Sequence, residues 1–145
     1  MDPQRISDEH HDFLAARSQG TLVTIRRNGR PQLSNVLYEY HRDAGTARVS
    51  VTADRAKTHN AAREPWVALH VSTEDFWGYL VAEGRAELSA VAADPHDEVV
   101  DQLVDYYRRL SGEHPDWDEY RQAQVDQGRL VMTVTVERTY GAPRV

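Results

Sequence analysis

Cysteine is absent from all 145 residues of the sequence. This absence excludes disulfide bonds, thiolate metal sites and cysteine nucleophiles. The sequence also lacks an apolar stretch long enough to span a bilayer, and its polar first residues form no signal-peptide pattern. The net charge of −6 argues against non-specific binding to nucleic acid. We therefore expect a cytoplasmic protein that binds neither a membrane nor nucleic acid.

Several motifs of nucleotide-binding proteins, hydrolases and metalloenzymes are also missing. No G-x-G is present, so the chain has no dinucleotide-binding fingerprint, and it has no Walker loop. No serine occupies a G-x-S-x-G turn, and the seven histidines form no H-E-x-x-H motif. His10 and His11 are adjacent and cannot both face one metal, whereas solvated or capping roles are common for histidine. We predict no metal site and assign no catalytic side chain.

Lysine is rare, because Lys57 is the only lysine among 17 basic residues. It lies in the most informative stretch of the chain, residues 46–65. Polar and apolar residues alternate over residues 46–52, which predicts a half-buried strand with Ser50 and Thr52 on its polar face. A short helix is predicted to follow over residues 55–63, and Pro65 ends it.

The start of this short helix has the character of an anion-binding site. Free backbone N–H groups and the positive end of the helix dipole favour an anion there, and Arg55 and Lys57 add full charges. An ammonium group is a compact charge that suits a phosphate. Taken alone, Lys57 fits an isolated surface lysine equally well. Basic residues grouped in an acidic chain nevertheless indicate a small anionic ligand.

The order of predicted elements indicates a mainly β protein with helices. Strands are predicted over residues 21–27, 30–40, 46–52, 66–71, 77–88 and 130–136, and helices over 7–18, 55–63, 94–111 and 115–127. Most strands are joined by hairpin-length turns, which favours an antiparallel sheet closed into a barrel. The length fits a single domain over residues 1–145.

Glycine, proline and aromatic residues add local detail. Asn28-Gly29 predicts a type I′ hairpin turn with positive φ at both residues. Pro95 is expected at the first position of the main helix. Gly84 inside a predicted strand indicates a bulge, a bend or a close approach. Trp77 and Tyr79 are two residues apart, so we expect them on one strand face, either stacking a flat ring or packing in a core or interface.

Five segments of the sequence resemble one known superfamily. They are GTLVTIRRNGRPQLSNV, VSVTADRAKTHNAAREP, WGYLVAEGRAEL, YYRRLSGEHPDWDEYRQA and VERTYG, and together they cover most of the chain. The sequence resembles the FMN-binding split β-barrel superfamily, also described as pyridoxamine 5′-phosphate oxidase-like. Within this superfamily, the segment GEHPDWDEYRQA resembles the sequences of the actinobacterial branch that uses the deazaflavin coenzyme F420.

The resemblance implies a six-stranded antiparallel split barrel with flanking α-helices, which forms a homodimer with two cofactors at its interface. It also implies a set of cofactor-binding residues. The phosphate would be held at Arg55, Ala56, Lys57 and Asn60, beside Ser50, Val51 and Thr52; Pro31 and Gln32 would approach the ring, and Trp77 and Tyr79 would come from the second subunit. We expect the dimer interface to include the strand face around Val36 and Tyr38.

The activity implied by the resemblance is an F420H2-dependent reductase that transfers a hydride to a conjugated organic acceptor. In such an enzyme the cofactor supplies the chemistry, and the protein binds, orients and excludes water. Two alternatives remain open: an FMN-dependent oxidase or reductase, and a protein that carries F420 without turnover. Pyridoxamine phosphate oxidation itself is not expected, because the substrate-phosphate arginines of that enzyme have no match in this sequence.

Overall fold

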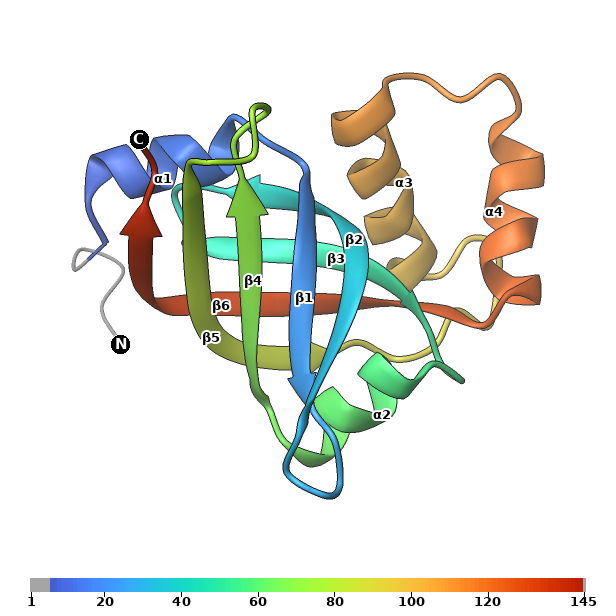
Figure 1. Cartoon of the computed structure of the whole chain (residues 1–145). Coiled ribbons are helices and arrows are strands. Elements are labelled where there is room, and N and C mark those ends of the chain that lie inside the picture. The colour runs from blue at the N-terminus through green and yellow to red at the C-terminus, as the bar shows by residue number, and fades with distance from the viewer. Residues whose placement is uncertain (1–5, 145) are drawn as a thin grey trace.

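The structure, a computed structural model, describes residues 6–144, which fold into a closed antiparallel barrel with flanking helices (Figure 1). The barrel order is β1-β2-β3-β6-β5-β4, and all neighbouring strands are antiparallel. The strands are β1 (Gln19–Ile25), β2 (Pro31–His41), β3 (Thr46–Thr52), β4 (Trp66–Ser72), β5 (Tyr79–Leu88) and β6 (Arg129–Ala142), and the helices are α1 (Asp8–Ala15), α2 (Ala56–Arg63), α3 (Glu98–Ser111) and α4 (Trp117–Asp126). The predicted fold class is confirmed.

Alternation along the strands fills the barrel with apolar side chains. In β3, Ala47, Val49 and Val51 point inward and are almost fully buried, whereas the polar residues between them face outward. Burying one such valine stabilises the fold by roughly 1.5–3 kcal/mol relative to leaving it exposed. Tyr38 of β2 is also fully buried, and its hydroxyl donates to the carbonyl oxygen of Leu14 at 2.7 Å.

The helices cover different parts of the barrel (Figure 1). α1 lies across one end, where Phe13 and Leu14 join the core. α2 lies at the opposite end and contributes Ala61. α3 and α4 follow β5 and stand together at one side of the barrel, with a small apolar cluster of their own that includes Val100 and Leu103. No helix of residues 6–144 has the length and apolar character needed to cross a membrane.

Two helix and turn predictions need correction. α3 begins at Glu98, not at Asp94-Pro95, because the Asp97 side chain caps it by accepting from the Val100 amide at 2.8 Å. The Asn28-Gly29 turn is not type I′, since only Gly29 has positive φ (85°). Its amide donates to the Arg26 carbonyl at 2.8 Å, the pattern of a three-residue hairpin loop with glycine in the left-handed position.

The predicted strand over residues 77–88 begins later in the structure. β5 starts at Tyr79, and Trp77 lies in the β4–β5 turn beside Phe76, whose φ is 82°. Trp77 and Tyr79 therefore do not share a strand face. Of the alternatives predicted for Gly84, the structure shows a bulge, as a register shift between Glu83 and Gly84. A Cβ at Gly84 would lie 2.0 Å from the Thr135 carbonyl oxygen, so only glycine permits this approach.

Candidate anion-binding site

Strands β2 and β3 pair over only part of their length, and the unpaired part forms an opening in the barrel wall. Their ladder runs from Tyr38↔Val49 to His41↔Thr46. Before Tyr38, β2 pairs with β1 alone, and after Val49, β3 pairs with β6 alone. We refer to the unpaired segments, residues 31–37 of β2 and 50–52 of β3, as the split.

A cavity of about 420 Å³ lies at the split, between the barrel and the helices α2, α3 and α4. It is lined by Asn35, Val36, Leu37, Ser50, Val51, Thr52, Arg55, Lys57, Tyr106, Tyr120, Gln124, Gln127 and Arg129. No aspartate or glutamate is among these residues, although the chain as a whole is acidic. The strand face with Ser50 and Thr52 that the alternation predicted forms the floor of this cavity.

Three cations, Arg55, Lys57 and Arg129, line the cavity, and none of the aspartates and glutamates of residues 6–144 lines it with them. Burial lowers the pKa of the Lys57 ammonium, and the nearby charges of Arg55 and Arg129 lower it further. Within residues 6–144, neither Arg55 nor Lys57 forms an ion pair. Like charges held together at a half-buried site cost free energy unless an anion neutralises them. The cavity therefore has the electrostatic character of an anion-binding site.

The N-terminus of α2 faces this site and differs from the other helix starts. α1, α3 and α4 each begin with a side-chain cap and with acidic residues in the first turn. α2 begins after Arg55, which provides no side-chain cap, and its first turn contains no acidic residue. The hydroxyl of Thr58 fixes the turn by donating to the Thr52 carbonyl at 2.7 Å. Free amides and the helix dipole add to the positive potential.

Polar groups that can contact a ligand complete the cavity. The Thr52 hydroxyl is buried and has no hydrogen-bond partner within residues 6–144, so it can donate to a bound anion. Arg129 is held in place, because its side chain donates to Gln127 Oε1 at 2.8 Å and to Ser50 Oγ at 3.2 Å. Gln124 is buried and donates to the Tyr120 carbonyl at 2.9 Å.

Comparison with known proteins gives the family. The model of the family described as pyridoxamine 5′-phosphate oxidase matches residues 6–142. The chain belongs to the pyridoxamine 5′-phosphate oxidase family.

Solved structures of similar fold include an F420 reductase, with 22% identity, a TM-score of 0.69 and coverage of 93% of this chain and 98% of that chain. The conserved hypothetical protein Rv2991 from Mycobacterium tuberculosis has 23% identity, a TM-score of 0.72 and coverage of 95% and 85%. The heme storage protein HutZ from Vibrio cholerae has 15% identity, a TM-score of 0.67 and coverage of 92% of both chains. At these identities the likeness shows a shared fold.

The structure of this family member brings together part of the predicted site. Ser50, Val51, Thr52, Arg55 and Lys57 line the cavity. Ala56 is the exposed first residue of α2, between the two cations, and does not line it.

Other predicted site residues lie outside the cavity. Pro31 and Gln32 begin β2 and pair with Ile25 and Thr24 of β1. Asn60 is buried, donating to the Thr24 hydroxyl at 3.1 Å and accepting from Arg63 at 3.1 Å. Its side chain therefore joins α2 to β1.

The β4–β5 turn lies at the end of the barrel opposite α2 (Figure 1). Trp77 belongs to this turn, and Tyr79 follows it as the first residue of β5. Trp77 is 68% exposed, and Tyr79 stacks on His70 with ring centroids 5.5 Å apart. Neither residue lines the cavity of its own chain. Their predicted contribution from a second subunit remains a prediction.

The cavity also contains residues that were not predicted as site residues. Asn35, Val36 and Leu37 come from β2, and the others from later parts of the chain: Tyr106 on α3, Tyr120 and Gln124 on α4, Gln127, and Arg129 at the start of β6. Burial raises the pKa of Tyr120 to about 12, and it also raises the pKa of Tyr106. Both phenols therefore stay protonated at neutral pH. Tyr106 and Tyr120 fall within the segment YYRRLSGEHPDWDEYRQA that carried the family resemblance, whereas Gln124, Gln127 and Arg129 lie after it.

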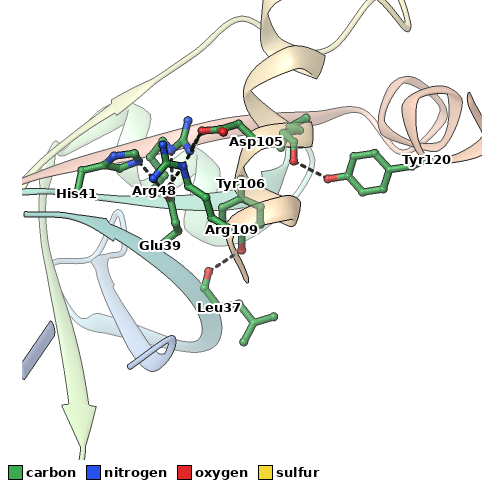
Figure 2. Close-up of polar contacts among 9 residues, drawn as sticks. Leu37, Glu39, His41, Arg48, Asp105, Tyr106, Arg109 and Tyr120 are labelled. Atoms are coloured by element: carbon green, nitrogen blue, oxygen red, sulfur yellow. Dashed lines mark hydrogen bonds and ion pairs between the residues drawn. The ribbon is translucent and has the colours of Figure 1, made fainter. Parts of the chain in front are cut away.

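A group of paired charges lies next to the split and attaches α3 to the barrel (Figure 2). Glu39 is 6% exposed, and its carboxylate accepts from Arg48 Nε at 2.7 Å and lies 2.7 Å from His41 Nε2. Asp105 of α3 accepts from Arg48 at 2.8 Å and from Arg109 at 3.0 Å. We refer to Glu39, His41, Arg48, Asp105 and Arg109 as the charge cluster. The carboxylates of the charge cluster are matched by its cations, so we assign the cluster a structural role.

A larger concavity of about 760 Å³ lies on the outer face of β1, β2 and β4. Its lining includes residues of both charges, because Arg17 Nε and Glu74 Oε1 form an ion pair at 3.4 Å. Its size alone does not make it the better candidate, because these charges neutralise each other. The cavity at the split has unmatched charge, which is the stronger indication of a charged ligand.

Proposed function

We propose that the chain is an oxidoreductase that binds coenzyme F420 with its phosphate in the cavity at the split and transfers a hydride to a conjugated organic acceptor. The observation that carries the proposal is the meeting of Arg55, Lys57 and Arg129 without an acid at the N-terminus of α2. Membership of the pyridoxamine 5′-phosphate oxidase family and the fold shared with an F420 reductase support it.

The residues present fit the phosphate end of such a cofactor. The three cations would neutralise the phosphate, and the unpartnered Thr52 hydroxyl would donate to one of its oxygens. The cofactor would supply the hydride chemistry, while the protein orients it and limits access of water. Pro31 and Gln32, at the start of β2, would contact the ring.

A second copy of the chain would complete the site. Trp77 and Phe76 are 68% and 67% exposed at the β4–β5 turn, and Leu33 and Leu37 of β2 are also exposed on the outer face of the barrel. Exposed large apolar residues of this kind are typical of an interface. Tyr38 was also expected at the interface, but it is fully buried in the barrel core and cannot contact a second copy. Sedimentation should give twice the mass of the 16.5 kDa chain, and a monomer at micromolar concentration would contradict the homodimer.

The alternative cofactor is FMN, which also carries a phosphate and is consistent with the family. A further alternative is a carrier that binds F420 without turnover. Binding titrations separate the two cofactors. Oxidation of reduced F420 by an enone or a quinone separates a reductase from a carrier.

None of the seven histidines lines the cavity, so replacing any one of them by alanine should leave the rate of F420 oxidation nearly unchanged. A loss of about a thousandfold would reveal a general acid.

The decisive experiment is a fluorescence titration of F420 and FMN with the wild-type protein and Lys57→Ala. The variant should bind the preferred cofactor more weakly by about 1.5–3 kcal/mol, because it loses a charge-assisted contact with the phosphate. Arg85→Ala is the matched control, since Arg85 is exposed on β5 and outside the cavity. Equal affinities of Lys57→Ala and the wild type for both cofactors would place the phosphate elsewhere.

A further inference from the structure

Tyr106 occupies the point at which β2 and β3 separate. Its hydroxyl donates to the Leu37 carbonyl oxygen at 2.7 Å, and Leu37 is the last residue of β2 before the β2–β3 ladder begins. Burial raises the pKa of this hydroxyl, while the backbone N–H of Ser50 partly offsets the shift. Leu37 and Ser50 are the residues that the next step of the ladder would have joined. The phenol thus lies between two strands that no longer pair with each other.

The rest of α3 fixes the phenol in this place (Figure 2). Asp105, the preceding residue, accepts from Arg48 of β3, and Arg109 lies 3.4 Å from Glu39 of β2. Tyr106 itself is only 9% exposed. α3 is therefore anchored to both strands on the paired side of the split, and its tyrosine reaches into the unpaired side.

We propose that Tyr106 is a positioning residue that sets the separation of β2 and β3 and thereby keeps the anion site preformed. This inference rests on the proposed function, because the ligand in question is the phosphate of the cofactor. Ser50, beside the phenol on β3, holds Arg129 through its hydroxyl at 3.2 Å. Thr52, two residues further along the same strand face, provides the unpartnered hydroxyl of the cavity. A change in the position of β3 would displace both groups together.

Tyr120 provides a matched control within the same cavity wall. Its hydroxyl also donates to a backbone carbonyl, that of Leu103, at 2.8 Å. This bond joins α4 to α3 and does not reach the barrel strands. Tyr106→Phe and Tyr120→Phe therefore each remove one hydroxyl and one hydrogen bond of the same type. Only the first removes a bond to the split.

The first test measures the affinity of each variant for F420 and FMN, together with its melting temperature. Tyr106→Phe should bind the cofactor about fivefold to tenfold more weakly, the effect of one lost hydrogen bond. Tyr120→Phe should have a similar melting temperature and wild-type affinity. Equal affinities of the two variants would overturn the role of Tyr106. If Lys57→Ala retained full affinity as well, the proposed phosphate site would fail with it.

The second test needs no cofactor. Backbone amide exchange should be faster in Tyr106→Phe than in Tyr120→Phe over residues 35–38 and 49–52, because the split has lost its bridge. Exchange in the β4–β5 hairpin should be the same in both variants. Unchanged exchange in the split of Tyr106→Phe would overturn the proposal, even if the protein bound neither cofactor.

Discussion

The outer face of β3 carries two regions of opposite electrostatic character within five residues, from Arg48 to Thr52. At one end, the partly buried Arg48 pairs with two carboxylates, those of Glu39 and Asp105. At the other end, Ser50 and Thr52 face Arg55, Lys57 and Arg129, and no carboxylate lines that space. The same strand thus passes from the charge cluster to the anion site.

The two regions show how the partners of a cation decide its role. Burial disfavours the charged form of Arg48, but hydrogen bonds to Glu39 and Asp105 outweigh this and raise the pKa of its guanidinium. Burial also disfavours the charged form of Lys57, and there the neighbouring cations lower the pKa further. The first cation is stabilised by the fold and holds α3 in place. The second is destabilised by the fold, and an anionic ligand would relieve this.

Removing an acid from the charge cluster should have the largest effect on stability. Glu39→Ala leaves Arg48, whose side chain is 13% exposed, without its buried partner. We expect a loss of about 3 kcal/mol in the free energy of unfolding, measured by urea denaturation. Glu113→Ala is the control, because Glu113 pairs with Arg108 at the exposed surface and should change stability by less than about 0.5 kcal/mol. Similar losses for both variants would contradict the distinction between buried and exposed pairs.

Removing a cation from the anion site should affect binding more than stability. Arg129→Met keeps an unbranched apolar stem but removes the charge that faces Lys57. We expect cofactor binding to weaken by about 1.5–3 kcal/mol, as for Lys57→Ala, with little change in the free energy of unfolding. Arg85→Met, exposed on β5 and outside the cavity, is the comparison variant, and it should bind the cofactor normally. The opposite pattern would mean that Arg129 is structural.

A smaller effect is expected in acid, where Asp105 of the charge cluster takes up a proton. Burial raises the pKa of Asp105, but hydrogen bonds from Arg48 and Arg109 outweigh this and lower it below the usual 3.8. A carboxyl group with a lowered pKa stabilises the fold at pH values above its unfolded pKa, and this stability is lost as the pH falls through the folded pKa. Asp105→Asn should therefore reduce the loss of stability between about pH 6 and pH 3 by less than about 1 kcal/mol. Asp43→Asn, in the exposed β2–β3 turn, is the control.

Local patterns predicted the barrel and the β3–α2 half of the site, because the information lies within a few residues. The alternation of Val49 and Val51 with Ser50 and Thr52 was sufficient to place a hydroxyl face beside Arg55 and Lys57. The other half of the site could not be found in this way. Tyr106 and Arg129 meet Ser50 only through packing across more than fifty residues of sequence.

Errors at the ends of elements have local physical causes. The capping side chain of Asp97 outweighed Pro95 as the start signal of α3. β6 extends to Ala142, well past the predicted end at residue 136, because its polar final residues pair with β5. The apolar pattern used to predict this strand stops at residue 136, whereas the pairing with β5 continues to Ala142. In both cases hydrogen bonding set the boundary, and hydrophobic periodicity did not reveal it.

Lys57 can be observed directly, because it is the only lysine in the sequence. Labelling lysine with carbon-13 at Cε would give a single side-chain resonance whose pH titration reports the pKa of this ammonium. Without cofactor, the pKa should lie below the usual 10.5. Addition of F420 or FMN should raise it, because a bound phosphate stabilises the charged form. A pKa of ordinary value that neither cofactor changes would contradict the assignment of the split as an anion site.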